Sequence, residues 1–390
     1  MTNDPELKAS IDAGFHALQS GDLPSARDSF TRLIASGNAN ANTWYGLSVV
    51  HRMSGEPTQE SDALERCLTL NPGHILGLIA KGDLHTAKGD SRAASAYYQT
   101  ALEHGARRPS LSPELRAALQ RVESINRQFT IEFERHLLGA LSATGVMGEK
   151  TPRFNHAVDL LLGKRQIYFQ QPKYFFFPEL AHIQFFDCSR FSWVAALEQK
   201  TSLIRAELQS ALARGSGFEP YIKPQPDRPN FNPRGLLNNA DWSAYYLIRS
   251  GVIETESAAL FPETMAALST IPLCQIPGRT PSVLFSLLRP GAHIQPHHGF
   301  TNFRLICHLP LLVPDGCGLR VGNEVRQWQE GKLLVFDDSI EHEAWNRSDE
   351  IRVILLFDIW RPELSHEERT LVSTMLTSID RFGPRSEWSE

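Results

Sequence analysis

The N-terminal part of the chain carries apolar side chains at helical spacing, in a pattern that repeats every 34 residues. Three sets of positions keep this period, and they are Gly14, Ser48 and Gly82; Gly21, Gly55 and Gly89; and Phe30, Leu64 and Tyr98. Glycine commonly ends a helix, and an alanine-rich amphipathic run such as SARDSFTRLI predicts the helix that follows. Each unit is therefore expected to be a helical hairpin, and three hairpins cover roughly residues 8–105. An unrelated helical bundle is the alternative.

Helical spacing continues beyond these repeats. Residues 106–127 predict a hinge rich in proline and serine, followed by a capping helix. The segments FTIEFERHLLGALSA and FNHAVDLLLG extend the helical pattern to about residue 163. We expect repeats and cap over residues 1–126, and a helical connector with the start of the next domain over residues 127–180.

Strand patterns dominate after residue 280. Short apolar runs separated by turn residues predict the strands of a sandwich or small barrel, and these runs are SVLFSLL, FRLICHLPLLV, GLRVG, KLLVFDD and RVILLFDIW. The Pro- and Asn-rich stretch 217–240 predicts a surface loop near a functional site. The β domain is expected over residues 181–390.

Composition narrows the function classes. The length of 390 residues allows about two or three domains. The 39 basic and 44 acidic residues give a formal charge of -5, which offers no footprint for nucleic acid or an anionic membrane surface. The acidic N-terminus lacks the pattern of a signal peptide, and no apolar run is long enough to span a membrane. Five cysteines without a Cys-x-x-Cys pair are typical of a reducing compartment, so we expect a cytoplasmic protein.

Candidate chemistry lies in the strand region. The stretch HIQPHHGF contains His293, His297 and His298, but Gly299 stands where the common His-x-Asp/Glu iron motif has its carboxylate. Three further polar residues fall in or beside predicted strands, where burial without partners is costly, and these are His308, His342 and Arg352. A single buried histidine is more often a hydrogen-bonded core residue than a ligand. Several of them together favour a metal site.

The helical hairpins resemble tetratricopeptide repeats. This resemblance implies a concave groove that takes peptides or protein partners, although three repeats can also be a spacer or a dimer interface. The match has one departure, because Glu60 stands where the other units have Ala26 and Ala94.

The C-terminal region resembles the aspartyl/asparaginyl β-hydroxylase family from about residue 180 to 370. The resemblance rests on an ordered set of segments, which are HIQPHHGFTNFRLICHLPL, GNEVRQW, KLLVFDDSIEHEAWN and IRVILLFDIWRPEL. It implies a double-stranded β-helix and an enzyme that uses Fe(II), 2-oxoglutarate and O2. Such enzymes hydroxylate a C–H bond and release succinate and CO2.

The same resemblance assigns roles to individual residues. It implies that His297 and His342 bind the iron and that the glycine at position 299 is a family trait, with water in place of the carboxylate. Arg352 and Ser286 match the pair that holds the distal carboxylate of 2-oxoglutarate, to which a planar guanidinium is well suited. His308 matches a histidine that contacts the same cosubstrate.

The sequence departs from the family pattern at one of these positions. Some members have an arginine two residues before the cosubstrate histidine, where this chain has Ile306. Arg304 is the nearby cation and shares a face with Ile306 if the strand is regular, so the C1 carboxylate is expected to be held by the metal together with either His308 or Arg304.

Other residues near the motifs have two readings each. Asp337 and Asp338 are expected either to orient a ligand histidine or to be turn residues. Trp242 is expected to be a core aromatic, with a position at the substrate entrance as the alternative.

The remaining histidines are expected to lie outside the metal site. His293 and His298 are expected to be supporting or solvated side chains, and His366 to begin an exposed helix.

The sequence therefore predicts a multidomain α and β protein, with a tetratricopeptide-like solenoid followed by a jelly-roll or cupin-like double-stranded β-helix with flanking helices. The predicted function is an Fe(II)- and 2-oxoglutarate-dependent dioxygenase that hydroxylates an Asp or Asn side chain of a protein or peptide. A small-molecule or lipid acyl substrate is an alternative. A non-catalytic repeat scaffold and a zinc-dependent cupin-like enzyme are rival classes, and the zinc enzyme would need a third protein ligand.

Overall fold

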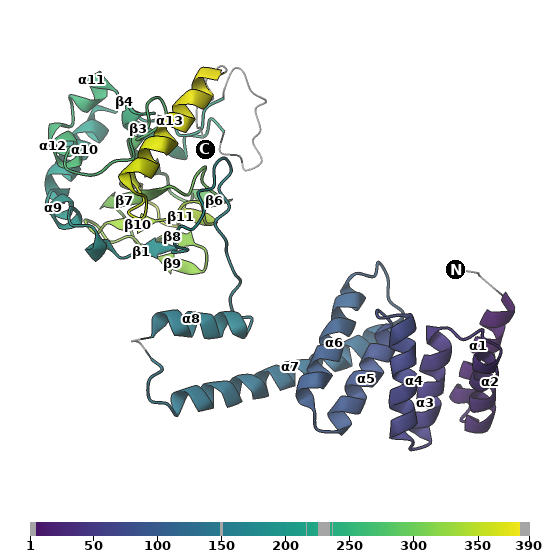
Figure 1. Ribbon diagram of the computed structural model, residues 1–390. Coiled ribbons are helices and arrows are strands. Elements are labelled where there is room, and N and C mark those ends of the chain that lie inside the picture. Colours follow the sequence, from purple (N-terminus) through teal and green to yellow (C-terminus); the bar gives the residue numbers. More distant parts are fainter. Residues whose placement is uncertain (1–4, 149–150, 216, 225–234, 236, 383–390) are drawn as a thin grey trace. The chain divides into compact units, whose positions relative to one another are not determined.

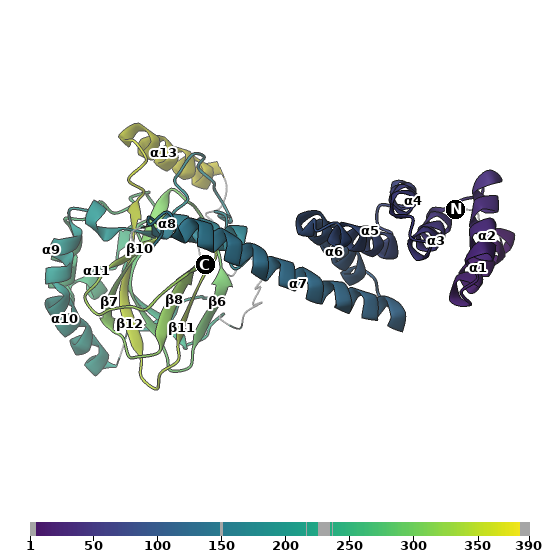
Figure 2. The same cartoon turned by 90° about the horizontal axis from the view of Figure 1, so that it is seen from below.

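The protein is described by a computed structural model that covers residues 5–148, 151–215, 217–224, 235 and 237–382. The chain divides into two compact units, Met1–Val158 and Asp159–Glu390. Figures 1 and 2 show both units, with many of their helices and strands labelled.

The first unit begins with three antiparallel helix pairs, which confirms the predicted tetratricopeptide-like hairpins. The pairs are α1 (Pro5–Gln19) with α2 (Leu23–Ala35), α3 (Ala41–Met53) with α4 (Pro57–Leu70), and α5 (Ile75–Ala87) with α6 (Ser91–Ala106). Gly21, Gly55 and Gly89 follow the first helix of each pair with φ between 74° and 79°, a conformation that glycine adopts at little cost.

Small residues in the first helices accommodate large side chains from the second helices. A β-carbon at Gly14 or Gly46 would collide with the ring of Phe30, and a β-carbon at Gly82 would collide with Tyr98. Phe30 and Tyr98 are fully buried. The small residues of the 34-residue pattern therefore mark places where two helices cross closely.

Glu60 departs from the repeat pattern because it has a charged partner. Its side chain is buried and accepts a hydrogen bond from Arg52 Nε at 2.9 Å. This ion pair joins α3 to α4 within one hairpin.

A 30-residue helix, α7 (Pro113–Ser142), follows the repeats, and α8 (Pro152–Leu161) comes next. Ser112 caps α7 by accepting a hydrogen bond from the amide of Leu115. The expected boundary after residue 126 falls inside α7, which continues unbroken because no glycine or proline interrupts residues 114–138.

The second unit contains two antiparallel sheets, as the predicted jelly roll requires. The large sheet has the order β1-β10-β7-β12-β5-β3-β2, with β4 beside β3, and the small sheet has the order β6-β11-β8-β9. The strands are β1 (Phe185–Phe186), β2 (Glu219–Pro220), β3 (Trp242–Arg249), β4 (Val252–Ile253), β5 (Val283–Leu288), β6 (His293–His297), β7 (Arg304–Leu312), β8 (Cys317–Val321), β9 (Glu324–Arg326), β10 (Leu334–Phe336), β11 (His342–Asn346) and β12 (Arg352–Trp360).

All five predicted strand segments form strands, as β5, β7, β8, β10 and β12. The sequence did not predict β6 and β11, because histidine, proline and glutamate interrupt their apolar pattern. These two strands carry His297 and His342. The apolar pattern therefore did not predict strands in which polar residues face the interior.

Helices cover one face of the large sheet (Figure 2). Those in the apolar core of that face are α9 (Val194–Gln199), α10 (Thr201–Arg214) and α12 (Pro262–Leu268). A second core, which includes Ile294, Ile306 and Leu319, lies between the two sheets. The unit also contains two short helices, η1 (Cys188–Arg190) and α11 (Thr255–Ala258). A longer helix, α13 (His366–Phe382), comes after the last strand.

The expected loop over residues 217–240 includes β2, while residues 225–234 and 236 lie outside the described residues. All five cysteines are free thiols. Among the helices within the described part of the chain, none has both the length and the apolar character needed to cross a membrane.

Candidate active site

Two histidines from neighbouring strands face each other between the sheets. His297 ends β6, His342 begins β11, and the two residues are directly paired in the small sheet. Their ring centroids are 4.1 Å apart, and both side chains are buried. The fold therefore brings together the two residues that the sequence proposed as iron ligands.

The hydrogen bonds of these imidazoles suit metal binding. His297 Nδ1 lies 2.8 Å from the carbonyl oxygen of Gln295, and His342 Nδ1 lies 3.1 Å from that of Ile340. A carbonyl oxygen only accepts, so each Nδ1 carries the proton and donates. Nε2 is then the nitrogen with the lone pair that a metal requires. The donor set of this pair fits a divalent iron ion.

The charge state of His342 is consistent with this role. Burial lowers its pKa from 6.5 to about 4, against the smaller opposing effect of the hydrogen bond to Ile340. A metal binds the neutral imidazole, so the ligand needs no deprotonation at neutral pH.

Gly299 leaves space for a carboxylate from another loop. A β-carbon at Gly299 would collide with the carboxylate of Asp338, and the amide of Gly299 donates to the carbonyl oxygen of Asp338 at 2.7 Å. The position where the common iron motif has its acidic side chain is thus already filled by Asp338, four residues before His342.

Arg352 is a buried cation without a carboxylate partner among the described residues. It begins β12, is 1% exposed, and lies on the ring of Trp328 at 4.9 Å. Its Nη1 donates to the carbonyl oxygen of Ser286 at 3.2 Å and to the hydroxyl at 3.4 Å. Burial lowers the pKa of Arg352 to about 10, which still leaves it charged at neutral pH. A buried charge is costly without a counterion, so this arginine is suited to an anionic ligand.

Ser286 has two donors beside its hydroxyl oxygen. In addition to Arg352, Trp242 Nε1 donates to this oxygen at 3.2 Å. A hydroxyl that accepts from two permanent donors has its own proton left to donate to an anion. Trp242 is itself held by Tyr221, which is stacked on it with centroids 4.0 Å apart. Trp242 is thus both a core aromatic and a lining residue.

His308 lies on β7 and also lines the site. Its side chain is buried, and Nδ1 has no hydrogen-bond partner. Burial, followed by the charge of Arg352, holds the pKa of His308 well below its usual value. It is therefore a neutral imidazole.

Arg304, a predicted contact for the C1 carboxylate, is already bound to two carboxylates of the protein. Arg304, Ile306 and His308 lie on the same face of β7. Arg304 lies 3.5 Å from Asp338 and 3.6 Å from Asp358 in two buried ion pairs. Ile306 lines the cavity, whereas Arg304 is not among its lining residues. The cation is near the site but is neutralised by the protein.

These side chains surround one cavity between the two sheets. Its lining residues come from both sheets and from the loop before β11, and they are Trp242, Ser286, Ile294, His297, Ile306, His308, Leu319, Phe336, Asp338, His342, Ala344, Arg352, Ile354 and Leu356.

The other candidate residues lie elsewhere. His293 is paired with Glu343 at 2.7 Å, and its side chain is 37% exposed. His298 is half-buried and is not among the lining residues, and His366 begins α13 with an exposed side chain. Within the described parts of the chain, no group of three or more His, Cys, Asp or Glu side chains is arranged so that it could hold a metal ion. The third protein ligand that the zinc alternative requires is therefore not found there.

Sequence reasoning missed Trp328 and Tyr221. Trp328 supports the guanidinium of Arg352, and Tyr221 supports Trp242. The GNEVRQW segment was part of the resemblance, but its tryptophan could not be assigned to Arg352 without the tertiary contact.

Comparison with known proteins identifies a match in this part of the chain. Residues 198–362 match the aspartyl/asparaginyl beta-hydroxylase family. The ornithine lipid ester-linked acyl 2-hydroxylase of Rhizobium tropici is 35% identical over 189 residues, which are 48% of this chain and 63% of that protein. The human aspartyl/asparaginyl beta-hydroxylase is 35% identical over 178 residues, which are 45% of this chain and 22% of that protein. The chain thus spans less than two thirds of each relative.

The structure comparison matches a different part of the chain. The Yersinia enterocolitica type III secretion translocator chaperone SycD is 18% identical, with a TM-score of 0.30, and the match covers 34% of this chain and 97% of that chain.

Proposed function

We propose that this chain is a dioxygenase dependent on Fe(II) and 2-oxoglutarate, and the match of residues 198–362 to the aspartyl/asparaginyl beta-hydroxylase family supports this proposal. The observation that carries the proposal is the meeting, in one cavity, of two buried imidazoles, those of His297 and His342, with a buried arginine that has no carboxylate partner among the described residues. A metal and a dicarboxylate together would satisfy these groups.

The roles proposed for the side chains follow from their contacts. His297 and His342 would hold Fe(II) through Nε2, since each Nδ1 donates to a backbone carbonyl. Arg352 and the hydroxyl of Ser286 would bind the distal carboxylate of 2-oxoglutarate. His308 would contact the cosubstrate from β7.

When bound, Fe(II) supplies the activation of O2, by which one oxygen atom enters the substrate C–H bond and the other enters succinate as CO2 leaves. The protein orients the cosubstrate and keeps water from the oxidant. The apolar walls formed by Ile294, Leu319 and Ile354 suit the second task.

The first candidate substrate is an Asp or Asn side chain of a protein or peptide. The family match supports it, and so do the helical repeats, because such solenoids have extended surfaces for peptides and protein partners.

A lipid or small-molecule acyl chain is the second candidate, and Ile306 favours it. This apolar residue lines the cavity, while the nearby cation Arg304 is already paired with Asp338 and Asp358. If Arg352 binds 2-oxoglutarate, the described lining residues offer no second cation, and such a site suits an uncharged group better than a carboxylate. The Rhizobium tropici relative is named an acyl 2-hydroxylase.

Binding experiments test the oxygenase proposal directly. Anaerobic titration with Fe(II), and then with 2-oxoglutarate, should show binding to the wild-type chain and loss of iron binding in His297→Ala and His342→Ala. His366→Ala is the matched control, since this histidine is exposed on α13. Iron binding that survives removal of both His297 and His342 would contradict the proposal.

Succinate formation then separates the substrates. Asp- and Asn-containing peptides and ornithine lipids would each be incubated with the iron-loaded enzyme, O2 and 2-oxoglutarate. The true substrate class should stimulate succinate release, and its members should gain one oxygen atom, as measured by mass spectrometry.

We also propose a cytoplasmic location, because five free thiols are typical of a reducing compartment.

A further inference from the structure

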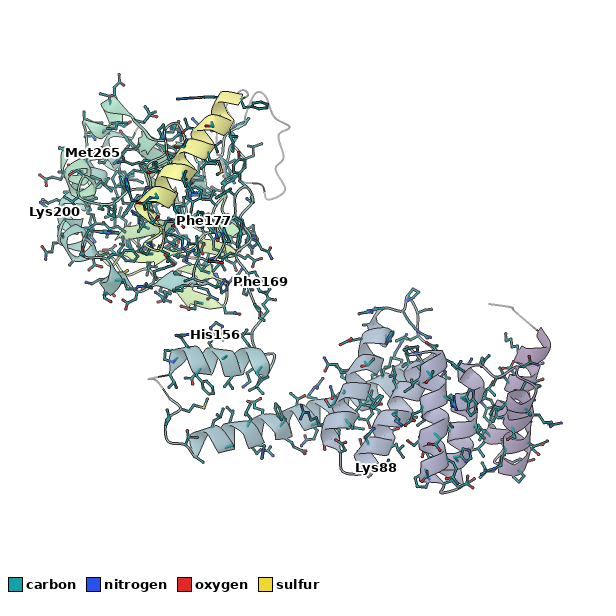
Figure 3. The ribbon with its side chains drawn as sticks, viewed as in Figure 1. Lys88, His156, Phe169, Phe177, Lys200 and Met265 are labelled. Carbon is teal, nitrogen blue, oxygen red and sulfur yellow. The ribbon has the colours of Figure 1, made fainter. Side chains whose placement is uncertain are left out.

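Residues 166–183, here called the strap, cross the two loops that adjoin the proposed metal ligands. One loop, residues 299–302, begins two positions after His297, and the other, residues 337–340, ends two positions before His342. Phe169 and Phe177 belong to the strap and are labelled in Figure 3. The strap precedes residues 198–362, so it lies outside the segment that matches the family.

Backbone hydrogen bonds attach the strap to the loop after His297. The amide of Lys173 donates to the carbonyl oxygen of Gly299 at 3.0 Å, and the amides of Tyr174 and Phe175 donate to that of Phe300 at 3.0 and 3.1 Å. Phe175 also forms a parallel bridge with Thr301.

The strap is bonded equally closely to the loop before His342. The amide of Gln171 donates to the carbonyl oxygen of Ser339 at 2.7 Å, and Gln170 forms an antiparallel bridge with Ile340. The carbonyl oxygen of Ile340 is also the acceptor for His342 Nδ1. The strap thus adjoins a group that orients a proposed ligand.

One side chain of the strap joins both loops. Gln170 Nε2 donates to Asp337 Oδ2 at 2.8 Å, and its Oε1 accepts from Asn302 Nδ2 at 3.1 Å. Asn302 is bonded to the backbone of Phe177 in both directions, at 2.7 and 2.8 Å.

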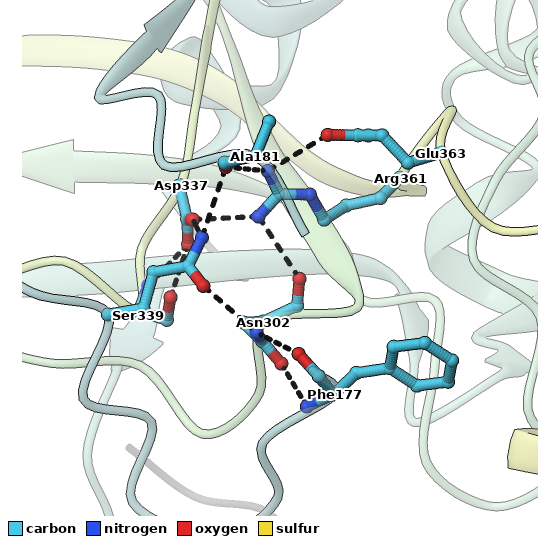
Figure 4. A network of polar contacts seen from close by, with 8 residues as sticks. Phe177, Ala181, Asn302, Asp337, Ser339, Arg361 and Glu363 are labelled. Atoms are coloured by element: carbon cyan, nitrogen blue, oxygen red, sulfur yellow. Dashed lines mark hydrogen bonds and ion pairs between the residues drawn. The ribbon is translucent and has the colours of Figure 1, made fainter. Parts of the chain in front are cut away.

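Arg361 completes this network from the end of β12 (Figure 4). It donates to Asp337 at 2.8 Å and to the strap carbonyl of Ala181 at 2.5 Å. Asn302, Asp337 and Arg361 are fully buried, so these bonds are protected from competition by water.

We propose that the strap is a positioning element for the metal site, and that the Gln170 amide fixes the two ligand loops relative to each other. The inference rests on the proposed function. Because hydrogen bonds behind metal ligands set their orientation, loss of such bonds typically weakens metal binding by about 10- to 100-fold. Gln170 acts through the loops and touches neither proposed ligand.

The test compares Gln170→Leu with Gln171→Leu in the full-length chain. The first substitution removes the amide that joins the loops, whereas the second removes an exposed side chain and keeps the backbone bond to Ser339. Co(II) is the probe, its dissociation constant is measured by titration well below the melting temperature, and its visible absorption spectrum is recorded at saturation. Gln170→Leu should raise the dissociation constant about 10- to 100-fold and change the spectrum, while Gln171→Leu should alter neither.

A merely structural role would lower the melting temperature and leave the spectrum of the saturated site as in wild type. A dissociation constant within about threefold of wild type, with an unchanged spectrum, would therefore overturn the inference while leaving the proposed function intact. Failure of the wild-type chain to bind Co(II) or Fe(II) would overturn both.

Hydrogen exchange on the wild-type chain gives a second measurement, which holds even if Gln170→Leu does not fold. Because linkage is reciprocal, a strap that favours metal binding must itself be stabilised by the metal. Co(II) should slow exchange at the amides of Gln171, Lys173 and Phe177. Equal exchange with and without bound metal would contradict the proposal.

Discussion

The carboxylate of Asp338 lies where a side chain at Gly299 would project. A β-carbon at Gly299 would collide with it, and the two residues are also joined by a backbone hydrogen bond of 2.7 Å. The glycine in the His-x-Gly motif is therefore a packing requirement of this site. A carboxylate can enter this space from the loop before β11, but not from the loop after β6 as well.

Gly299→Asp should consequently destabilise the protein instead of completing an iron triad. The collision and the proximity of two carboxylates should lower the free energy of unfolding by at least about 1–3 kcal/mol. Chemical denaturation measures this effect. Gly148→Asp is the control, because nothing lies within 4 Å of a β-carbon at Gly148. Unchanged stability together with tighter iron binding in Gly299→Asp would refute the packing explanation.

Arg352→Ala should weaken 2-oxoglutarate binding while iron still binds. Removing one partner of a buried ion pair costs about 3–5 kcal/mol, which is roughly a 100- to 4000-fold loss of affinity at about 1.4 kcal/mol per tenfold. Arg352→Lys should recover only part of it, since an ammonium lacks the bidentate fork. Titration of the Fe(II)-loaded variants at equal metal occupancy measures the effect, with Arg347→Ala as the control. Affinity within about threefold of wild type in Arg352→Ala would mean that the anchor lies elsewhere.

Arg304→Ala should affect stability more than cosubstrate affinity. Its guanidinium lies 3.5 Å from Asp338 and 3.6 Å from Asp358, and both carboxylates are buried. Removing the cation that these two carboxylates share should lower the free energy of unfolding by about 3–5 kcal/mol. Unfolding and 2-oxoglutarate titration are measured on the same variant. A large loss of affinity with little loss of stability would instead favour Arg304 as the contact for the C1 carboxylate.

Acid should destabilise the metal-free protein partly through His308. Its folded pKa lies well below 6.5 because of burial, so the unfolded chain binds a proton that the folded chain does not. The free energy of unfolding should therefore decrease as the pH falls below about 6.5. His308→Gln should show a shallower decrease between about pH 7 and pH 5, measured by urea unfolding. An equal slope in both proteins would show that His308 does not contribute.

The sequence by itself determined the repeats, five of the strands and the candidate chemistry. The period of 34 residues and the apolar runs depend on spacing within one segment, and spacing is legible without the fold. His297, His342, Arg352, Ser286 and His308 were identified from the order of motifs, and the fold gathers all of them around one cavity.

Tertiary structure decided which groups occupy which space. The filling of the Gly299 position by Asp338, the ion pairs of Arg304 and the bridge through Gln170 join residues that are 34 to 167 positions apart. The strap could not be identified from its sequence, because its bonds to the ligand loops are largely made by backbone groups that every residue carries. The spacing of apolar residues indicates which face of a segment is buried. Which residues contact that face is determined only when distant segments pack together.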